Sequence, residues 1–532
     1  MLRSLTKRFS LFDLFLCFCS AGSLILAFPR TDLWILAWGS LVPLMFVLDG
    51  KKPRSAFRWA YACGLLFFTG TLYWFFNITK WFTVIGALGI VLLLLYLSLY
   101  FGLFGLAYSY FSRQKPINKL FVLPSAWVVL EFIRAHLFTG FDWASLGHTQ
   151  YTNLPVIQIA DITGVSGVSF IVMMVNVLMK EYLTANFFNK TSRSRKAALP
   201  LFATTAVAGA LVLAYGMFRL YPSINKDRSG PGYSIAVIQA NIPQEIKWEK
   251  TAWIGIMDKY VAMTKEALPH GPDLIIWPET SYPGYLWEDK ELFTQLQVFV
   301  RSVKIPLLLG SVLKEDQSYY NAAILLSGNG DIAGIYRKVH LVPFGEYLPL
   351  RAIFPFLSDL VAIGDFTAGD RWTTFSPMLT QAGHQPDQLF SVLICFEDTV
   401  ARVARQFVNH GAQLLVNITN DAWFGDTKAP FMHLQSAVFR TVENRKGLVR
   451  AANTGASCFI DQWGRTTRCV ENDIGGDKQK TYISGYAIEK VDFNDKMTFY
   501  TKYGDVFTIL CFGCILLGII QRKRAKGPDK YC

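Results

Sequence analysis

The sequence predicts two architectures in one chain, a polytopic helical membrane domain and an α/β domain. Three observations predict this arrangement. Hydrophobic residues make up 52% of the 532 residues and charged residues only 17%, a balance typical of membrane proteins. Long apolar runs fill the first 220 residues. After Tyr221 the content of charge, Pro and Gly rises, and the apolar runs shorten to the length of strands.

Eight apolar runs are candidate spans, and most of them approach the roughly 20 residues that a helix needs to cross a hydrocarbon core. The runs are Leu11–Phe28, Leu33–Leu48, Trp59–Asn77, Phe82–Phe111, Leu120–Leu137, Val156–Leu178, Ala197–Leu220 and Asp505–Ile520. No clear small-x-small cleavage site follows the first run, so we expect it to stay as a helix. The predicted domains are a membrane domain of seven helices over 1–220, an α/β domain over 221–502, an eighth helix over 503–521 and a basic tail over 522–532.

The positively charged residues cluster in the pattern expected of loops on one side of a membrane. Its net charge is +13, and most Lys and Arg lie at the two termini and in alternate loops, with clusters at 3–8, 51–58, 113–119, 190–196 and 522–526. The intervening loops hold only Arg30 and Lys80. The positive-inside rule then places both termini in the cytoplasm and 221–502 on the far side, the periplasm of a bacterium. We therefore expect a membrane partner and no nucleic acid.

The region after Tyr221 alternates between two kinds of segment. Short apolar runs end in polar clusters at Ser234–Gln239, Leu274–Trp277, Pro306–Leu309, Ala322–Leu326, Phe390–Cys395 and Gln413–Ile418. Helix-like stretches alternate with them at Thr251–Leu268, Leu292–Val303, Val400–His410 and His433–Arg445. This alternation favours an α/β sandwich.

Three residues predict a cysteine acyl-transfer site. Glu279 and Cys395 each follow an apolar run directly, and Lys338 follows another. A cysteine nucleophile needs a base, donors for the oxyanion and a fixed geometry. We assign Glu279 as the base, and Lys338 with the backbone N–H of Phe396 as the oxyanion partners. A helix beginning near Asp398 would add thiolate character to Cys395. Singly, each residue has an ordinary explanation as a solvated Glu, a surface Lys or a core thiol.

These residues match the Glu–Lys–Cys triad of the nitrilase (carbon–nitrogen hydrolase) superfamily. The local sequence resembles one branch more closely, the apolipoprotein N-acyltransferase family of the bacterial inner membrane. The resemblance is carried by the segments Asn241–Gln244, Lys247–Trp248, Trp277–Thr280, Tyr336–Lys338, Gly345–Tyr347 and Asn420–Phe424. It implies an αββα sandwich and two-step acyl transfer through a thioester on Cys395. The implied partners are a phospholipid donor, usually phosphatidylethanolamine, and a diacylglyceryl-cysteine apolipoprotein acceptor.

The resemblance also implies supporting residues. Glu346 is expected to orient Lys338, Glu397 to lie beside the nucleophile, and Trp248 and Trp423 to belong to substrate loops. Phe396 stands where the family pattern has Tyr, which leaves the backbone N–H in place but removes a phenol.

Two apolar, aromatic insertions interrupt the otherwise polar domain. Tyr282 and Trp287 belong to the first, and Phe354 and Phe356 to the second. We expect them to enter the outer leaflet and admit lipid, because aromatic residues suit interfacial depth. The alternative is ordinary packing of buried loops.

The nine cysteines form no disulfide framework, although Cys458 and Cys469 would be able to pair outside the cytoplasm. No Cys or His spacing suggests a metal, and we expect no cofactor and a monomer. Two rival functions stay open. One is a membrane-anchored hydrolase (amidase) that uses the same triad with water. The other is a transporter, for which the intramembrane charges Glu131 and Arg134 are the main support.

Overall fold

The computed structural model describes residues 9–80, 83–188, 192–224, 232–348, 366–376, 388–474 and 477–525. These residues divide into two compact units. A helical unit holds the described parts of Met1–Thr79, Gly86–Tyr221 and Tyr503–Cys532, and an α/β unit holds those of Lys80–Ile85 and Pro222–Lys502.

The helical unit consists of apolar helices of unequal length. They are α1 (Phe9–Ala27), α2 (Val42–Leu48), α3 (Pro53–Thr71), η3 (Tyr73–Lys80), α4 (Thr83–Phe111), α5 (Pro116–His136), α6 (Leu154–Ile157), α7 (Ala160–Thr163), α8 (Val165–Leu183), α9 (Ser192–Ile224) and α16 (Val506–Ala525). Among the described residues, five helices are long and apolar enough to cross a membrane. A sixth is counted if α3 and η3, which meet at a bend of 54°, form one span.

The predicted span Val156–Leu178 differs from the structure. Two short helices, α6 and α7, occupy its first part, and the long helix α8 begins only at Val165. Gly164 separates α7 from α8 with φ +63°, a backbone conformation that glycine adopts without a steric penalty. The prediction rested on apolar composition alone, which does not reveal this break between helices. The predicted spans Leu11–Phe28 and Leu33–Leu48 fall on shorter apolar helices over Leu11–Ala27 and Trp34–Leu48.

The α/β unit contains two sheets. The six-stranded sheet has the order β13-β1-β2-β3-β4-β5, and the five-stranded sheet has the order β10-β9-β8-β7-β6. The strands are β1 (Tyr233–Gln239), β2 (Leu274–Ile276), β3 (Leu307–Glu315), β4 (Ser318–Leu326), β5 (Ile332–Arg337), β6 (Phe390–Ile394), β7 (Leu414–Thr419), β8 (Gly447–Ala452), β9 (Cys458–Ile460), β10 (Thr466–Cys469) and β13 (Gly485–Val491). Strands β1, β2 and β3 run parallel, as do β6, β7 and β8.

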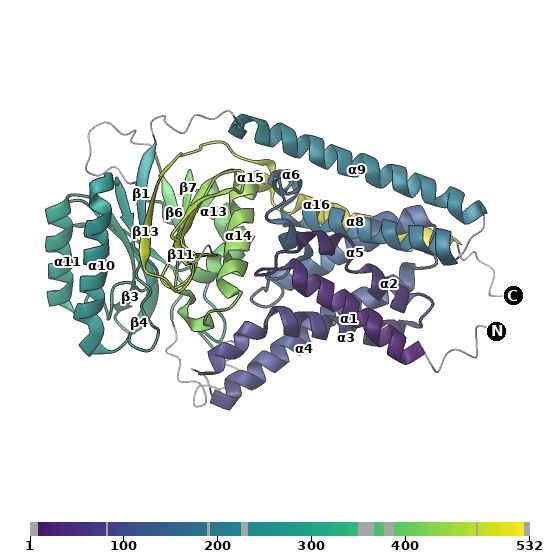
Figure 1. Ribbon diagram of the computed structural model, residues 1–532, viewed down its shortest axis with the longest axis horizontal. Coiled ribbons are helices and arrows are strands. Elements are labelled where there is room, and N and C mark those ends of the chain that lie inside the picture. Colours follow the sequence, from purple (N-terminus) through teal and green to yellow (C-terminus); the bar gives the residue numbers. More distant parts are fainter. Residues whose placement is uncertain are drawn as a thin grey trace. The chain divides into compact units, whose positions relative to one another are not determined.

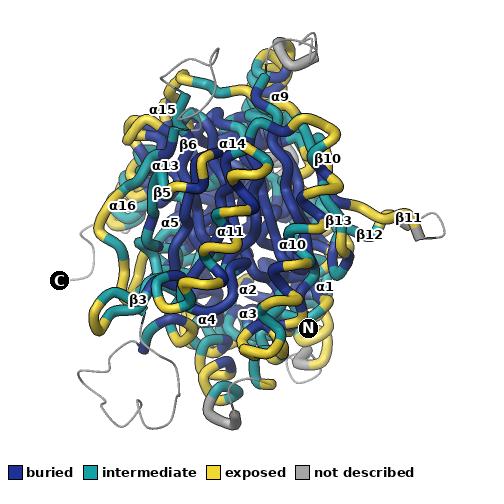
Figure 2. Tube along the Cα trace, turned by 90° about the vertical axis from the view of Figure 1, so that its left-hand side faces the viewer, coloured by how far each residue is buried: buried dark blue, intermediate teal, exposed yellow. Residues whose placement is uncertain are grey.

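Helices cover the outer faces of both sheets (Figure 1). The first pair, α10 (Trp253–Ala267) and α11 (Lys290–Val303), packs on the six-stranded sheet and shares its apolar core. The second pair, α13 (Ala401–Asn409) and α14 (Ala429–Asn444), lies with the five-stranded sheet. Most residues of the central strands are buried, α10 and α11 alternate between buried and exposed residues, and α14 is buried along nearly its whole length (Figure 2). The result is the four-layer αββα sandwich that the resemblance implies.

Side chains tie the two sheets together at one end. The Gln239 side chain at the end of β1 accepts a hydrogen bond from the Ser457 N–H at 3.1 Å. Nearby, the Ile242 N–H donates to the Asn453 side chain at 2.9 Å, just past β8. The Tyr336 hydroxyl on β5 donates to Glu397 at 2.7 Å, just past β6. The carboxyl ends of β1 and of the parallel strands β6 to β8 therefore meet, as the edges of parallel sheets that carry active sites do.

Candidate active site

Glu279 lies three residues past β2 and is 7% exposed. One carboxylate oxygen accepts from the Asn321 side chain at 2.7 Å, and the other accepts from the backbone N–H of Asn420 at 2.8 Å. Gly310 on β3 leaves room for this segment, because a Cβ there would approach the Glu279 Cα to 2.6 Å. The carboxylate is therefore fixed in direction by two elements, β4 and the end of β7.

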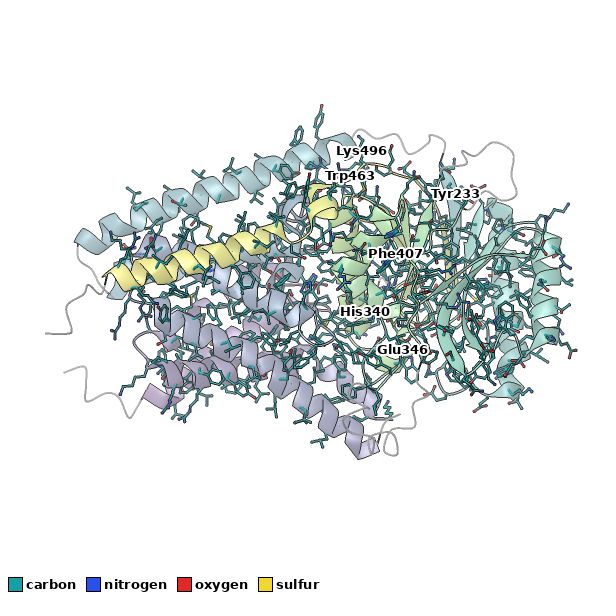
Figure 3. The ribbon with its side chains drawn as sticks, turned by 180° about the vertical axis from the view of Figure 1, so that it is seen from behind. Tyr233, His340, Glu346, Phe407, Trp463 and Lys496 are labelled. Carbon is teal, nitrogen blue, oxygen red and sulfur yellow. The ribbon has the colours of Figure 1, made fainter. Side chains whose placement is uncertain are left out.

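Lys338 directly follows β5 and is 1% exposed. Its Nζ lies 2.9 Å from Glu346 Oε1 and 2.8 Å from Oε2. Glu346 also accepts from Asn321 at 2.8 Å and from the Val342 N–H at 2.8 Å. Glu346 thus contacts the Lys338 ammonium with both carboxylate oxygens. His340 and Glu346 lie on the segment that follows β5 (Figure 3).

Cys395 is the first residue of a five-residue 3₁₀ turn, Cys395–Thr399, directly after β6. Its backbone φ is +53°, a strained conformation for a residue with a side chain. Asn241, Thr280 and Phe344 at the same end of the sandwich also have positive φ, at 53°, 46° and 59°. Strain of this kind persists only where the surroundings enforce it and gathers at functional sites.

Glu397 supplies part of that enforcement. It is fully buried, and one carboxylate oxygen accepts from the Tyr336 hydroxyl and from the N–H groups of Val339 and His340 at 2.7, 3.0 and 3.0 Å. The other oxygen accepts from the Ile394 N–H at 2.7 Å. Glu397 therefore joins the segment just past Lys338 to the residue just before Cys395, which fixes the two elements relative to each other.

A second buried network holds the other side of the nucleophile. The Asn417 amide on β7 donates to the carbonyl oxygens of Leu393 and Cys395 at 3.1 and 3.3 Å. Its oxygen accepts from Arg450 at 2.6 Å, and Arg450 also binds Asp398 at 2.6 Å and Asp421 at 3.1 Å. Neither Arg450 nor Asn417 was predicted from the sequence, since an Arg within a strand carries no signal of its own.

The segment Asn241–Gln244 is hydrogen-bonded to Asn420, which in turn contacts Glu279. The Asn420 side chain donates to Gln244 at 2.8 Å and accepts from Asn453 at 3.0 Å. The same Asn420 presents its N–H to Glu279. These amides form a bridge between the ends of β1, β7 and β8 that positions the Glu279 carboxylate. The sequence indicated the motif but not this task, because the partners are far apart along the chain.

Lys247 is a further buried charge, to which the sequence assigned no role. It is 3% exposed, and its Nζ donates to the backbone oxygen of Glu279 at 3.1 Å. Burial lowers the pKa of Lys247 to about 7, against the attraction of Glu279 and Cys395. In the sequence, Lys247 lies two residues past Glu245 in a polar loop. A lysine in such a loop is ordinarily solvated, so the sequence did not indicate its burial.

The electrostatics of the three predicted residues are coupled. Burial raises the pKa of Glu279, and the nearby Lys338 counteracts this. Burial would lower the pKa of Lys338, but Glu346, Cys395 and Glu279 raise it above its ordinary value. Burial and Glu279 raise the pKa of the Cys395 thiol well above its ordinary value, while Lys338 lowers it. Glu279 and Lys338 therefore shift the pKa of the Cys395 thiol in opposite directions.

Two expectations about the nucleophile need correction. The helix α13 begins at Ala401, later than the expected Asp398, and a 3₁₀ turn precedes it. The pKa of Cys395 is also raised and not lowered, since desolvation outweighs the local donors. Desolvation therefore favours the thiol form of Cys395 over the thiolate.

The first aromatic insertion does not form an exposed loop. Tyr282 is 1% exposed and donates its hydroxyl to the Asp289 carbonyl at 3.0 Å. Trp287 packs partly buried against the same apolar core. These two residues therefore pack in the core of the domain, which is the alternative to a lipid entrance. Phe354 and Phe356 of the second insertion lie outside the described residues.

The remaining predicted residues lie around the site. Trp248 is 45% exposed, which leaves its indole available on the surface, and Trp423 is half-buried in the 3₁₀ turn Asp421–Phe424. The ring of Phe396 stacks on His340 with centroids 5.9 Å apart. Burial lowers the pKa of that histidine to about 4, so the ring is neutral near pH 7 and serves packing.

A four-layer αββα sandwich with a Glu, a Lys and a Cys gathered at its strand ends defines a carbon–nitrogen hydrolase domain. The family model for carbon–nitrogen hydrolase matches residues 234–475, and that for the apolipoprotein N-acyltransferase N-terminal domain matches residues 20–178. The apolipoprotein N-acyltransferase of Geobacter metallireducens is 36% identical, with 94% of this chain and 93% of the relative covered. This chain belongs to the apolipoprotein N-acyltransferase family.

Two further similar proteins cover different shares of the chain. The apolipoprotein N-acyltransferase of Pasteurella multocida is 29% identical over 98% of this chain and 96% of its own length. The amidase from Nesterenkonia sp., a solved structure, is 17% identical with a TM-score of 0.38, covering 53% of this chain and 97% of that chain.

Proposed function

We propose that the chain moves an acyl chain from a phospholipid to the α-amino group of the diacylglyceryl-cysteine that begins an apolipoprotein. The reaction passes through a thioester on Cys395. The observation that carries the proposal is the convergence of Glu279, Lys338 and Cys395 in a chain that belongs to this family over nearly its whole length. The apolar helices of the other unit fit a substrate that resides in a membrane.

In the first step, Glu279 takes the proton of the Cys395 thiol and the thiolate attacks the sn-1 ester carbonyl of the donor. The carbonyl oxygen becomes an oxyanion, which the Lys338 ammonium and the Phe396 N–H stabilise. Collapse of this intermediate breaks the ester C–O bond. Glu279 returns its proton to the leaving alkoxide, and a lysophospholipid departs.

In the second step, the α-amino group of the acceptor attacks the thioester carbonyl. Glu279 takes a proton from the nitrogen, the same donors stabilise the oxyanion, and the C–S bond breaks to give an amide. The Cys395 thiolate then recovers the proton from Glu279. One base therefore serves both half-reactions, which suits a carboxylate fixed by Asn321 and Asn420.

We further propose phosphatidylethanolamine as the donor, and a bacterial inner membrane location with the α/β unit in the periplasm. Eight spans with both termini in the cytoplasm account for the basic clusters in alternate loops. The catalytic residues come from one chain, so a monomer is sufficient. A hydrolase that uses the same triad with water is the rival, and the family membership of the chain weighs against it.

The test is direct. Purified chain given radiolabelled phospholipid should form a covalent acyl adduct that hydroxylamine removes, and Cys395→Ala should abolish it. Cys511→Ala, which changes another buried thiol, should retain the adduct. Release of free fatty acid without any adduct on the wild-type chain would instead support the hydrolase.

A further inference from the structure

Lys247 is an unusual buried charge because so little of its hydrogen-bonding capacity is used. An ammonium has three donors, and among the described residues the Glu279 carbonyl is the one hydrogen-bond partner recorded for it. No carboxylate of the described residues lies within ion-pair distance of its Nζ. Burying such a charge costs free energy unless something compensates for it.

Lys338 shows the contrast. Its ammonium is matched by both oxygens of Glu346 at 2.9 and 2.8 Å, so much of its charge is already offset in the resting site. The charged or titratable groups that face Lys247 are Glu279, on the segment after β2, and Cys395, after β6. Lys338 lowers the pKa of the Cys395 thiol, and Lys247 is a second positive charge beside the same pair, without a carboxylate that offsets it.

We propose that Lys247 is a positioning residue of this site, whose ammonium anchors the main chain at Glu279 and stabilises the anionic form of Cys395. The inference rests on the proposed function only in taking Glu279 and Cys395 as the reacting pair. It explains why an ammonium is buried beside a carbonyl oxygen without a carboxylate of its own. Burial lowers the pKa of Lys247 to about 7, so this support weakens as the pH rises above neutrality.

The experiment measures alkylation of Cys395 by iodoacetamide against pH, in the full chain in detergent, with the modified peptide quantified by mass spectrometry. Lys247→Met should shift the profile upward by about one pH unit, which slows alkylation at pH 7 about tenfold. Lys250→Met, at an exposed position of the same segment, should leave the profile unchanged. Lys247→Arg should restore most of the rate.

Lys247→Gln separates charge from hydrogen bonding, because the amide retains a donor for the Glu279 carbonyl. A shift like that of Lys247→Met supports the proposal. A wild-type profile in Lys247→Gln overturns it, as does a wild-type profile in Lys247→Met. Alkylation requires no lipid, so these outcomes do not depend on whether the chain transfers acyl groups.

A second, independent observation concerns Cys458 and Cys469. They are directly opposite each other in the antiparallel pair β9–β10. The adjacent backbone bond, Val470 N–H to Ser457 O at 2.9 Å, makes the cysteines a non-hydrogen-bonded pair, in which the Cα atoms lie about 4.5 Å apart. This spacing is within the range of a disulfide. Each thiol also shifts the pKa of the other, raising that of Cys458 and lowering that of Cys469.

The two thiols differ in access. Cys458 is fully buried, whereas Cys469 is half-buried and lines a surface hollow of about 400 Å³ with Arg468, Lys478 and Lys480. The contact with Cys458, together with Lys480, lowers the pKa of Cys469 to about 7. An accessible thiolate with a second thiol behind it is the arrangement of a dithiol that undergoes exchange.

We infer that Cys458 and Cys469 form a redox modification site that takes up a disulfide by exchange with a small-molecule or protein disulfide. The Cys469 thiolate attacks the external disulfide, forms a mixed disulfide and releases one thiolate. Cys458 then loses its proton to solvent and attacks the Cys469 sulfur, which releases the second thiolate. The pair is oxidised by two electrons and the external disulfide is reduced to two thiols.

The test treats the purified full chain with oxidised glutathione and then with N-ethylmaleimide. The expected result is one linked peptide pair joining Cys458 to Cys469, with both protected from the maleimide. Cys458→Ser should stop at a glutathione adduct on Cys469. Maleimide on both cysteines of the treated wild type, or a stable glutathione adduct on its Cys469, would overturn the inference.

Discussion

Both units of this chain bury charged side chains, but they satisfy them differently. In the helical unit, Glu131 on α5 accepts from the Trp127 indole at 2.8 Å and from the Leu146 N–H at 2.6 Å. Arg134 donates to the Phe141 carbonyl at 3.2 Å and to the Ser145 hydroxyl at 2.8 Å. In the α/β unit, by contrast, Lys247 has one partner among the described residues and faces a carboxylate and a thiol.

The number of hydrogen bonds distinguishes charged residues that stabilise the fold from those that lie beside the proposed reacting groups. Glu131 and Arg134 bind the segment 141–146, which follows their own helix, so their bonds close a local turn. This use of both residues removes the main support for a transport path. Lys247 instead keeps donors unused beside a carboxylate and a reactive thiol, which is costly for a buried charge with only a structural role. Arg450 shows that the α/β unit also contains the structural kind.

The largest effect is expected from Glu279→Gln. The amide keeps the shape of the side chain but cannot accept the thiol proton, so the rate of acyl-adduct formation should fall about 10²–10⁴-fold. Single-turnover labelling with radioactive phospholipid measures this rate. The fold should persist, because the amide oxygen of the variant still accepts from the Asn420 N–H. A variant with near wild-type labelling would exclude Glu279 as the base.

The pH dependence of the same step is a second test of Glu279. A base must be ionised to act, so the rate should fall as the pH drops through its pKa. Burial raises that pKa above the ordinary value near 4.5, and the acidic limb should therefore lie above pH 4.5. The residual rate of Glu279→Gln should lack this limb. Single-turnover rates of both proteins across the acidic range provide the measurement.

Arg450→Met tests the structural charges of the α/β unit. The substitution leaves Asp398 and Asp421 buried without their cation, and removing one partner of a buried ion pair costs about 3–5 kcal/mol. The denaturation midpoint of the purified chain should fall accordingly. Arg468→Met, at an exposed position, should change the free energy of unfolding by no more than about 0.5 kcal/mol. Equal midpoints for the two variants would contradict a structural role for Arg450.

Glu131→Leu tests the structural charges of the helical unit. It leaves the Trp127 indole N–H and the Leu146 N–H without their acceptor, at a cost of about 1–3 kcal/mol. Thermal unfolding in detergent measures the loss, and alkylation of Cys395 should keep its wild-type rate. Abolished acyl transfer in a chain of wild-type stability would instead assign Glu131 a direct part in the reaction.

Sequence reasoning anticipated the elements whose signals are local. The runs at Ser234–Gln239 and Phe390–Cys395 correspond to β1 and β6 to within one residue, because buried parallel strands read as continuous apolar runs. Glu279 and Cys395 were recognisable because each lies at or near the end of such a strand, and Lys338 because it directly follows the antiparallel strand β5. Strands β8, β9, β10 and β13 were missed. Strand β9 has only three residues, and polar residues interrupt the other three strands.

The resemblance indicated Glu346 and Glu397, but other groups that position the three residues were not recognisable. Asn321 lies within β4 and Arg450 within β8, at positions where only the pairing of distant strands reveals a partner. The raised pKa of Cys395 also depends on burial among residues far along the chain. Spacing indicates where a strand ends, but long-range contacts determine desolvation and hydrogen bonding.

The smallest effect is expected from Tyr282→Phe, which tests whether the first aromatic insertion is packing or a lipid entrance. The ring remains in the core while the hydroxyl bond to the Asp289 carbonyl is lost, so the free energy of unfolding should fall by about 0.5–1.5 kcal/mol. Lipid turnover should be unchanged, because the side chain is 1% exposed and cannot contact a bilayer. A clear loss of turnover with wild-type stability would instead indicate that this loop contacts the lipid substrate. Burial would then not be sufficient to identify a side chain as purely structural.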